Sequence, residues 1–116
     1  MLKKYFHEKS KLINWLFYAT NTGDEDAAFL YGMMLFDEGE ASNNLELIYK
    51  AEHHFLNFEF KENELEALYM LSTIYGLSDS PLYNKEKRNR YLVMASERGH
   101  DYSTSFIKYL KEKGYW

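Results

Sequence analysis

The feature that most constrains this fold is a stretch of sequence that recurs after 40 residues. Residues 27–35 (AAFLYGMML) and residues 67–75 (ALYMLSTIY) match in type at nearly every apolar position. In both stretches, small or apolar residues stand at positions i, i+3, i+4, i+7 and i+8, which is one face of an α-helix. A period of this length is typical of helical-repeat architectures, in which each unit buries its apolar face against the next.

Turn residues between the periodic stretches predict where the chain reverses direction. Gly23, Asn63 and Gly99 each stand four residues before the start of a helical stretch. Gly and Asn are the residues that best tolerate the left-handed conformation at the end of a helix. We therefore expect a tight turn between antiparallel helices at each of these three residues.

Two further signals mark where helices start. Asn43 followed by Glu46 has capping-box spacing, and Asn84 precedes a helix that should begin near Lys85. We predict an all-α fold of about six antiparallel helices that forms a single domain over residues 1–116. The expected helices span residues 3–20, 24–37, 43–60, 64–76, 84–97 and 100–113.

These residues resemble a known repeat. The pattern Ala-x-x-x-Leu-x-x-x-Tyr, then a loop, then an aromatic residue and Ala-x-Glu-x-Gly, is similar to the Sel-one-like repeat (SLR) family, a relative of the tetratricopeptide repeat. The matching residues are Ala67, Leu71, Tyr75, Asn84, Tyr91, Leu92, Ala95, Ser96, Glu97 and Gly99. The resemblance implies a short right-handed solenoid of α-hairpins that acts as a scaffold for protein–protein contacts, without catalysis.

Charge is unevenly distributed along the chain. The net charge is −4, yet residues 21–66 contain twelve acidic side chains and only two lysines. Such a segment repels nucleic acid phosphates and anionic lipid, and it attracts a basic surface. We therefore expect a protein partner with a basic surface and expect neither nucleic acid nor membrane as a partner.

No group of residues predicts catalysis, a cofactor or a metal site. Cysteine is absent, and the chain contains no Gly-rich phosphate loop. The four histidines, at positions 7, 53, 54 and 100, lack metal-ligand spacing, and we interpret them as surface residues. Serines and a threonine at 103–105 follow His100 and Asp101 at a helix start, where Asp and Ser normally cap backbone N–H groups.

The helix expected over residues 24–37 is apolar on more than one face. Its core stripe consists of Ala27, Leu30, Tyr31, Met34 and Leu35. A second apolar stripe, at i, i+4 and i+7, consists of Phe29, Met33 and Phe36. Either neighbouring helices enclose this second stripe, or it offers an aromatic and methionine surface to a partner.

Acidic residues close the same helix. Asp37, Glu38 and Glu40 stand where negative charge is unfavourable by about 0.3–1 kcal/mol each, so they are either partner-binding residues or solvated acids. In short repeat arrays the first helix of each hairpin lines the concave face. Tyr69 and Thr73, from the next such helix, are therefore further candidates for partner binding.

Two further features lie in the C-terminal part of the chain. Gly114 should end the last helix, so that Tyr115 and Trp116 either cap the array or bind a partner. A group of basic residues is interpreted as the solvated outer face of a helix: Lys85, Lys87, Arg88 and Arg90.

Two functional hypotheses follow. The more specific one is a small acidic immunity or inhibitor protein that binds and neutralises a bacterial toxin; the alternative is a cytoplasmic adaptor or assembly protein that binds a peptide in a concave helical groove. A homodimer through the Phe29 face is compatible with both. The first residues lack the apolar run of a signal peptide, and no stretch reaches the length of a membrane span, so we expect a cytoplasmic protein.

Overall fold

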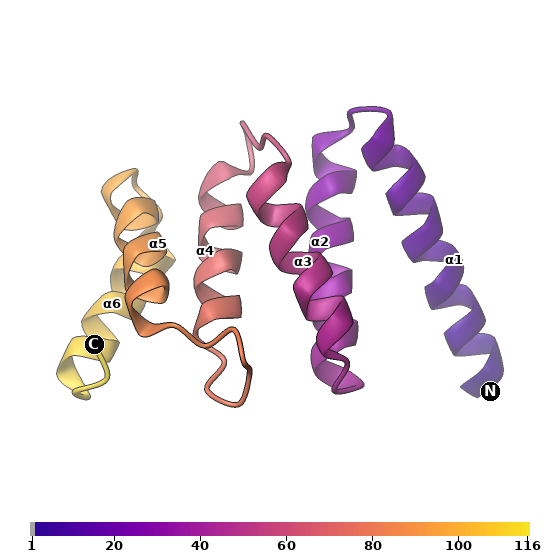
Figure 1. The fold of residues 1–116 in the computed structure, drawn as a ribbon. Helices are drawn as coiled ribbons and strands as arrows, with labels where there is room; N and C mark the ends of the chain where they lie inside the picture. Colours follow the sequence, from indigo (N-terminus) through magenta and orange to yellow (C-terminus); the bar gives the residue numbers. More distant parts are fainter. Residues whose placement is uncertain (1) are drawn as a thin grey trace. The chain divides into compact units, whose positions relative to one another are not determined.

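The protein is all-α, with six helices over the residues that the structure describes (Figure 1). The computed structural model describes the backbone of residues 2–116 and the side chains of residues 11–116. The helices are α1 (Leu2–Asn21), α2 (Glu25–Ala41), α3 (Leu45–Asn57), α4 (Glu64–Tyr75), α5 (Lys85–Glu97) and α6 (Asp101–Glu112). The predicted helical class and the predicted number of helices are confirmed for these residues.

The boundary between α2 and α3 lies later than the sequence predicts. α2 continues to Ala41, and the residue that caps α3 is Asn44, whose Oδ1 accepts a hydrogen bond from the Glu46 amide at 3.1 Å. Asn43, the predicted cap, has a φ angle of +54° and lies in the left-handed region. Asn43 and Asn44 are adjacent, and an asparagine suits both a left-handed turn and an N-cap. The predicted cap at Asn43 is therefore wrong by one residue.

Two of the three predicted left-handed turn residues are confirmed. Gly23 has a φ angle of +92° and Gly99 one of +99°. Asn63 instead has a φ angle of −101° and stands at the N-cap of α4, where its side chain accepts no capping hydrogen bond. The connection before α4 therefore uses a different turn from the other two.

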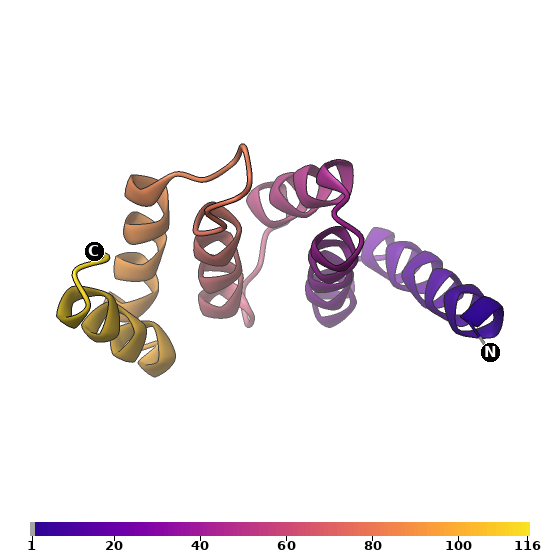
Figure 2. The same ribbon diagram turned by 90° about the horizontal axis from the view of Figure 1, so that it is seen from below.

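The chain divides into two compact units, residues 1–59 and residues 60–116. In the first unit α2 contacts both α1 and α3, and in the second α5 contacts both α4 and α6. Each helix runs antiparallel to the helix before it within its unit, as Figures 1 and 2 show. Each unit is thus a helical hairpin with one further helix against it.

The core of the first unit centres on a face of α2 that carries small residues. Ala28, Gly32 and Gly39 are buried on this face, and α3 packs against them. A Cβ atom at Gly32 would lie 2.6 Å from Cζ of Phe55, and one at Gly39 would lie 2.8 Å from Cγ1 of Ile48. The absence of side chains at the two glycines lets α3 approach α2 closely.

The burial of α2 differs from the prediction at two positions. Leu30, which we placed in the core stripe, is 49% exposed, whereas Phe36 from the second stripe is only 4% exposed. Ala27 and Leu35 are buried as predicted, and Tyr31 and Met34 are half-buried. The predicted core stripe is therefore wrong at Leu30, because α3 packs on the face of α2 that contains the glycines.

The second unit has an apolar core centred on α4 and a folded-back C-terminus. The buried residues of α4 are Ala67, Leu68, Met70, Leu71, Ser72, Ile74 and Tyr75. Gly114, with a φ angle of +77°, follows the end of α6 as predicted. The Tyr115 amide donates to the carbonyl oxygen of Leu110 at 2.8 Å, so the chain turns back after the helix.

No helix in the described part of the chain combines the length with the apolar character that a membrane crossing requires.

Candidate protein-binding surface

The outward face of α2 carries a stripe of acidic and apolar residues. These residues stand at i, i+4, i+7, i+11 and i+14 on one side of the helix, and we refer to them as the α2 stripe. The α2 stripe consists of Asp26, Leu30, Met33, Asp37 and Glu40. Met33 is half-buried and the other four are exposed. Apolar side chains in the middle and carboxylates towards both ends form the pattern of a protein-binding surface with an apolar centre and a charged rim.

Leu30 is the main apolar contribution to this surface. Its side chain is 49% exposed, which leaves about half of its apolar area in water. Complete burial of a leucine contributes about 1.5–3 kcal/mol, so a partner that covers the rest of Leu30 gains roughly 1 kcal/mol from this residue alone. An isolated exposed leucine is ordinary, but this one is flanked by carboxylates on the same stripe.

The carboxylates at the C-terminal end of the α2 stripe have no cationic partner. The side-chain carboxylates of Asp37 and Glu40 form no hydrogen bond or ion pair with any described residue, and the last turn of α2 contains no basic side chain. The helix dipole makes negative charge unfavourable at this end by about 0.3–1 kcal/mol per group. Both carboxylates are therefore available to a positively charged group that would relieve this repulsion.

A second apolar surface lies on α1. Trp15 is 65% exposed, Tyr18 is 62% exposed and Leu12 is 46% exposed. The rings of Trp15 and Tyr18 stack on each other with centroids 5.9 Å apart and planes 15° apart. Trp and Tyr are the residues that most often dominate binding energy at interfaces. This surface was not predicted, although Leu12, Trp15 and Tyr18 recur every three residues along one edge of a helix.

A half-buried histidine fixes α3 against α2. His54 Nε2 lies 2.6 Å from the carbonyl oxygen of Ala28, and it is the donor because a carbonyl oxygen only accepts. Its ring also packs edge-on against Tyr31, with centroids 5.1 Å apart. Burial lowers the pKa of His54, the hydrogen bond to Ala28 raises it, and the nearby His53 lowers it. This contact helps to set which face of α2 points outward.

The remaining predicted residues of the first unit lie away from the α2 stripe. Phe36 is buried in the core. Phe29 is half-buried and packs edge-on against Phe55, with centroids 6.0 Å apart. Glu38 is half-buried, and its carbonyl oxygen accepts hydrogen bonds from the amide and hydroxyl of Ser42. Of the predicted first-unit residues, Met33, Asp37 and Glu40 are thus the ones that share one outward stripe.

Tyr69 and Thr73 belong to the second unit. Thr73 Oγ1 donates to the carbonyl oxygen of Tyr69 at 3.1 Å, and both side chains are half-buried. The Tyr69 ring contacts His100 and Tyr102, with centroid distances of 5.7 and 5.1 Å. Burial raises the pKa of the Tyr69 phenol, and the interaction with Tyr102 raises it further. The concave groove expected to include these residues stays a prediction.

The interpretation of the histidines as surface residues holds for only one of the three that can be assessed. His53 is exposed, whereas His54 is half-buried between helices. His100, also half-buried, is itself the N-cap of α6, and its Nδ1 accepts from the Ser103 amide at 3.3 Å and lies 2.6 Å from Ser103 Oγ. The expected caps among Asp101 and the serines are therefore wrong. His7 lies outside the described side chains.

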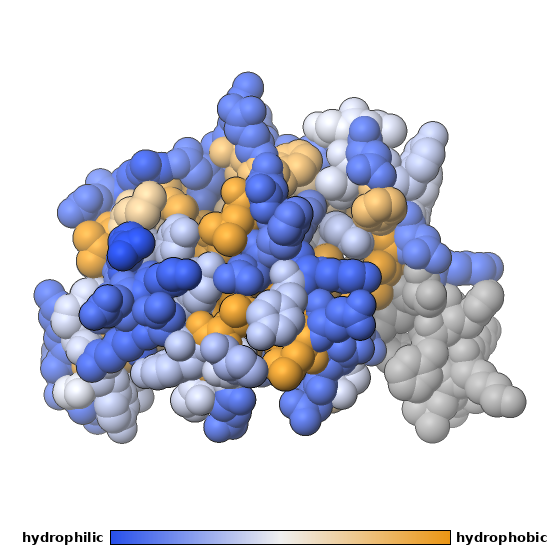
Figure 3. Space-filling model, viewed as in Figure 1, coloured by the Kyte–Doolittle hydropathy of each residue, from blue (hydrophilic) through white to orange (hydrophobic). Residues whose placement is uncertain are grey.

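The serines at the start of α6 and the acidic and histidine side chains were the residues with potential for chemistry. Ser103 is fully buried, which shields its hydroxyl from substrate. Across the described residues, no group of three or more His, Asp or Glu side chains is placed to hold a metal ion. The surface in Figure 3 is mostly hydrophilic, with several separate apolar patches. What the described side chains offer most clearly is contact area with adjacent charge.

The chain was also compared with known proteins. No protein-family model, curated protein or solved structure matches it.

Proposed function

We propose that this chain is a non-catalytic protein-binding module and that the α2 stripe binds a partner with a basic surface. The observation that carries the proposal is the half-exposed Leu30 on the same helix face as Asp37 and Glu40, two carboxylates without a cation. A partner with an apolar residue for Leu30 and a lysine or arginine for the carboxylates would satisfy both.

The charge of the two units supports a basic partner at the first one. Residues 1–59 carry ten acidic and five basic side chains, whereas residues 60–116 carry eight acidic and nine basic ones. The negative potential is therefore centred on the unit that contains the α2 stripe. Exposed charges act over about 8 Å at physiological salt, so this potential increases the association rate mainly at short range.

In its most specific form, the proposal is a small acidic immunity protein that binds and neutralises a bacterial toxin in the cytoplasm. An inhibitor of this kind needs fast capture and slow release. The carboxylates provide fast capture, because charged groups at the rim of an interface mainly change the association rate. Leu30 and the stacked Trp15 and Tyr18 supply apolar area for slow release, because buried aromatic and aliphatic anchors mainly set dissociation rates.

A site-specific crosslink tests where the partner binds. A photoreactive amino acid in place of Leu30 should capture the partner, whereas the same amino acid in place of Leu56, which is 48% exposed on α3, should not. The first protein to test is the product of the gene adjacent to the one that encodes this chain. Equal capture from both positions would show that the α2 stripe is not the binding surface.

Charge variants then test the electrostatic part. Neutralising both Asp37 and Glu40 to their amides should lower the association rate for the captured partner by about tenfold at low salt and by less at high salt. Glu46→Gln, an exposed acid on α3, is the matched control and should change the rate little. Co-expression completes the test: the wild-type chain should suppress the partner's toxicity, and Leu30→Asp should not. If the captured partner is not toxic, the immunity-protein proposal is wrong and only the proposal of a protein-binding module is kept.

We further propose that the chain belongs to the Sel-one-like repeat family and that its hairpins stack as a short right-handed solenoid. The supporting observation is that α3 and α5 begin and end 40 residues apart, each after an N-cap asparagine, Asn44 and Asn84. Several pairs of residues 40 apart are both buried, such as Ala27 with Ala67 and Leu35 with Tyr75. Small-angle scattering of the intact chain tests the stacking, because two independently tumbling units would give a broader distance distribution than one array.

A further inference from the structure

Arg88 is a buried cation in a position that the first hairpin fills with an apolar residue. It is 8% exposed, and Ile48, 40 residues earlier at the equivalent place in α3, is 5% exposed. The repeat thus packs this position with a hydrocarbon side chain in one hairpin. Burying a guanidinium instead is unfavourable unless the charge is paired. The interpretation of Arg88 as part of a solvated helix face is wrong, although Lys85, Lys87 and Arg90 are exposed as expected.

The hydrogen bonds of Arg88 go only to neutral acceptors. Nη2 donates to the carbonyl oxygen of Tyr115 at 2.7 Å, and Nε donates to Oδ1 of Asn89 at 3.0 Å. No carboxylate among the described residues pairs with it. A guanidinium has five N–H donors, so these two bonds leave three for another acceptor. The positive charge is held in place but is not neutralised by the described part of the chain.

The lack of a side chain at Gly76 makes room for the stem of Arg88. A Cβ atom at Gly76 would lie 3.1 Å from Cδ of Arg88, closer than a comfortable contact. Gly76 is the C-cap of α4, so the arginine crosses from α5 towards the end of the neighbouring helix. The backbone at residue 115 then anchors the guanidinium from the other side.

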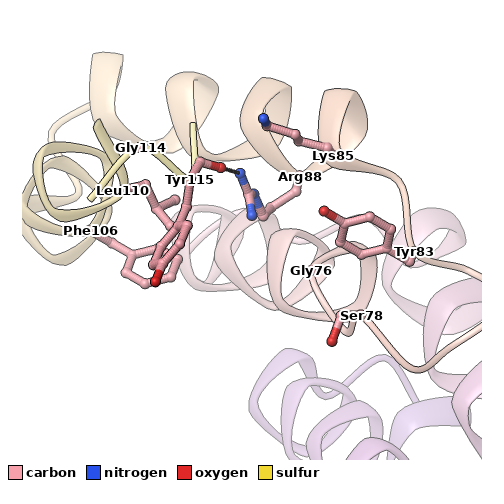
Figure 4. A pocket seen from close by; sticks show the side chains of 9 residues that line it. All are labelled: Gly76, Ser78, Tyr83, Lys85, Arg88, Phe106, Leu110, Gly114 and Tyr115. Carbon is pink, nitrogen blue, oxygen red and sulfur yellow. Dashed lines mark hydrogen bonds between the residues drawn. The ribbon is translucent and has the colours of Figure 1, made fainter. Parts of the chain in front are cut away.

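Arg88 lines an open pocket of about 570 Å³ in the second unit. Figure 4 shows Arg88 between Tyr83 on one side and Phe106 and Tyr115 on the other. Lys85 adds a second positive charge, and none of the nine lining residues is acidic. Phe106 and Leu110 form an apolar wall of the same pocket. The size falls within the range of about 300–1,000 Å³ that is typical of small-molecule sites.

We infer that this pocket binds an organic anion: a carboxylate attached to an apolar or aromatic group. The planar guanidinium presents parallel N–H donors that match the two oxygens of a carboxylate. The apolar group of the ligand would pack against the wall of Phe106 and Leu110. A bare inorganic anion would leave this wall exposed to water. This inference concerns the second unit and does not depend on the partner proposed for the α2 stripe.

Calorimetry and NMR on the full chain test this site with three probes. The probes are 3-phenylpropionate, its neutral amide and inorganic phosphate. The carboxylate should bind saturably and shift the backbone amide resonances of Gly76 and Gly114, which both line the pocket. The amide and phosphate should each bind at least about tenfold more weakly, because the first lacks charge and the second lacks an apolar group.

The other outcomes overturn the inference in different ways. Equal binding of the amide would show that the pocket does not recognise charge. Equal binding of phosphate would show that the apolar wall contributes nothing. Absence of saturable binding by all three probes would show that Arg88 is only a structural anchor for the C-terminal segment.

Variants on α5 assign the effect to particular cations. Arg88→Lys keeps the charge but loses the planar fork, and it should weaken 3-phenylpropionate binding by about tenfold. Lys85→Gln, at an exposed position where folding is not at risk, should weaken it about threefold. Arg90→Gln is the matched control, since it removes the same charge from an exposed residue that does not line the pocket. A loss in Arg90→Gln equal to that in Lys85→Gln would show non-specific attraction and would overturn the assignment.

Discussion

Gly32 lies where α2 and α3 approach each other closely, and replacing it with alanine has two opposite effects on stability. A Cβ atom there would lie 2.6 Å from Cζ and 2.9 Å from Cε2 of Phe55, and 2.9 Å from Cδ2 of His54. Phe55 is 4% exposed and packs against Phe29, so its ring has little freedom to move. His54 is held by its 2.6 Å hydrogen bond to Ala28. The extra methyl group would therefore displace at least one held side chain.

The expected change in stability follows from these magnitudes. Glycine to alanine inside an exposed helix stabilises by about 0.5–1 kcal/mol. Forcing a methyl group into a well-packed core costs about 1–3 kcal/mol, and loss of the His54 hydrogen bond costs about 0.5–1.5 kcal/mol. The free energy of unfolding of Gly32→Ala should thus fall by about 0.5–4 kcal/mol, although helix propensity alone predicts a rise.

Urea denaturation followed by far-UV circular dichroism measures this change. Glu40→Ala, at an exposed position on the same helix, is the control and should be neutral or slightly stabilising. Phe55→Leu removes the atom nearest to the new methyl group, so the double variant should show a favourable coupling of about 1 kcal/mol relative to the two single changes. A Gly32→Ala protein that is more stable than the wild type would refute the close packing of α2 against α3.

Further predictions concern neighbouring residues. Gly39→Ala should destabilise more than Gly32→Ala, because its Cβ would meet backbone atoms of Asn44 and Ile48 at 3.1 Å, which cannot rotate away; the same urea titration ranks the two. Burial lowers the pKa of His54, so the unfolded chain binds the proton more readily, and the free energy of unfolding should decrease as pH falls through the unfolded value of about 6.5, by at most about 1.4 kcal/mol per pH unit. Titrations of His54→Gln should show a weaker pH dependence, and an unchanged profile would contradict this. Asn44→Ala should lower the free energy of unfolding by about 1 kcal/mol, because α3 loses its N-cap hydrogen bond.

The helices and most turns follow from local sequence. Apolar residues at helical spacing lie within one element, and a glycine such as Gly23 or Gly99 adopts its left-handed conformation through interactions within a few residues. Local sequence does not decide whether Asn43 or Asn44 is the cap, because an asparagine suits both the turn and the cap position. The two alternatives differ by a single capping hydrogen bond.

The candidate surface was predictable only in part. The acids Asp37 and Glu40 were identified from their unfavourable place near a helix C-terminus, which is a local electrostatic argument. Leu30 was assigned to the core, and Trp15 and Tyr18 were not singled out, because exposure depends on which neighbours cover a helix. Periodicity identifies faces of a helix but does not say which face a neighbour will cover.

What the sequence determined by itself is therefore the set of helices, their order and the uneven charge, since these depend on residues close together in the chain. Tertiary structure alone decided that α2 turns its glycines inward and Leu30 outward, because the absence of two side chains lets α3 approach there. It also decided that Arg88 is buried while its neighbours on α5 are exposed. Contacts between distant segments select one face among several that local chemistry permits, and that selection determined both candidate sites.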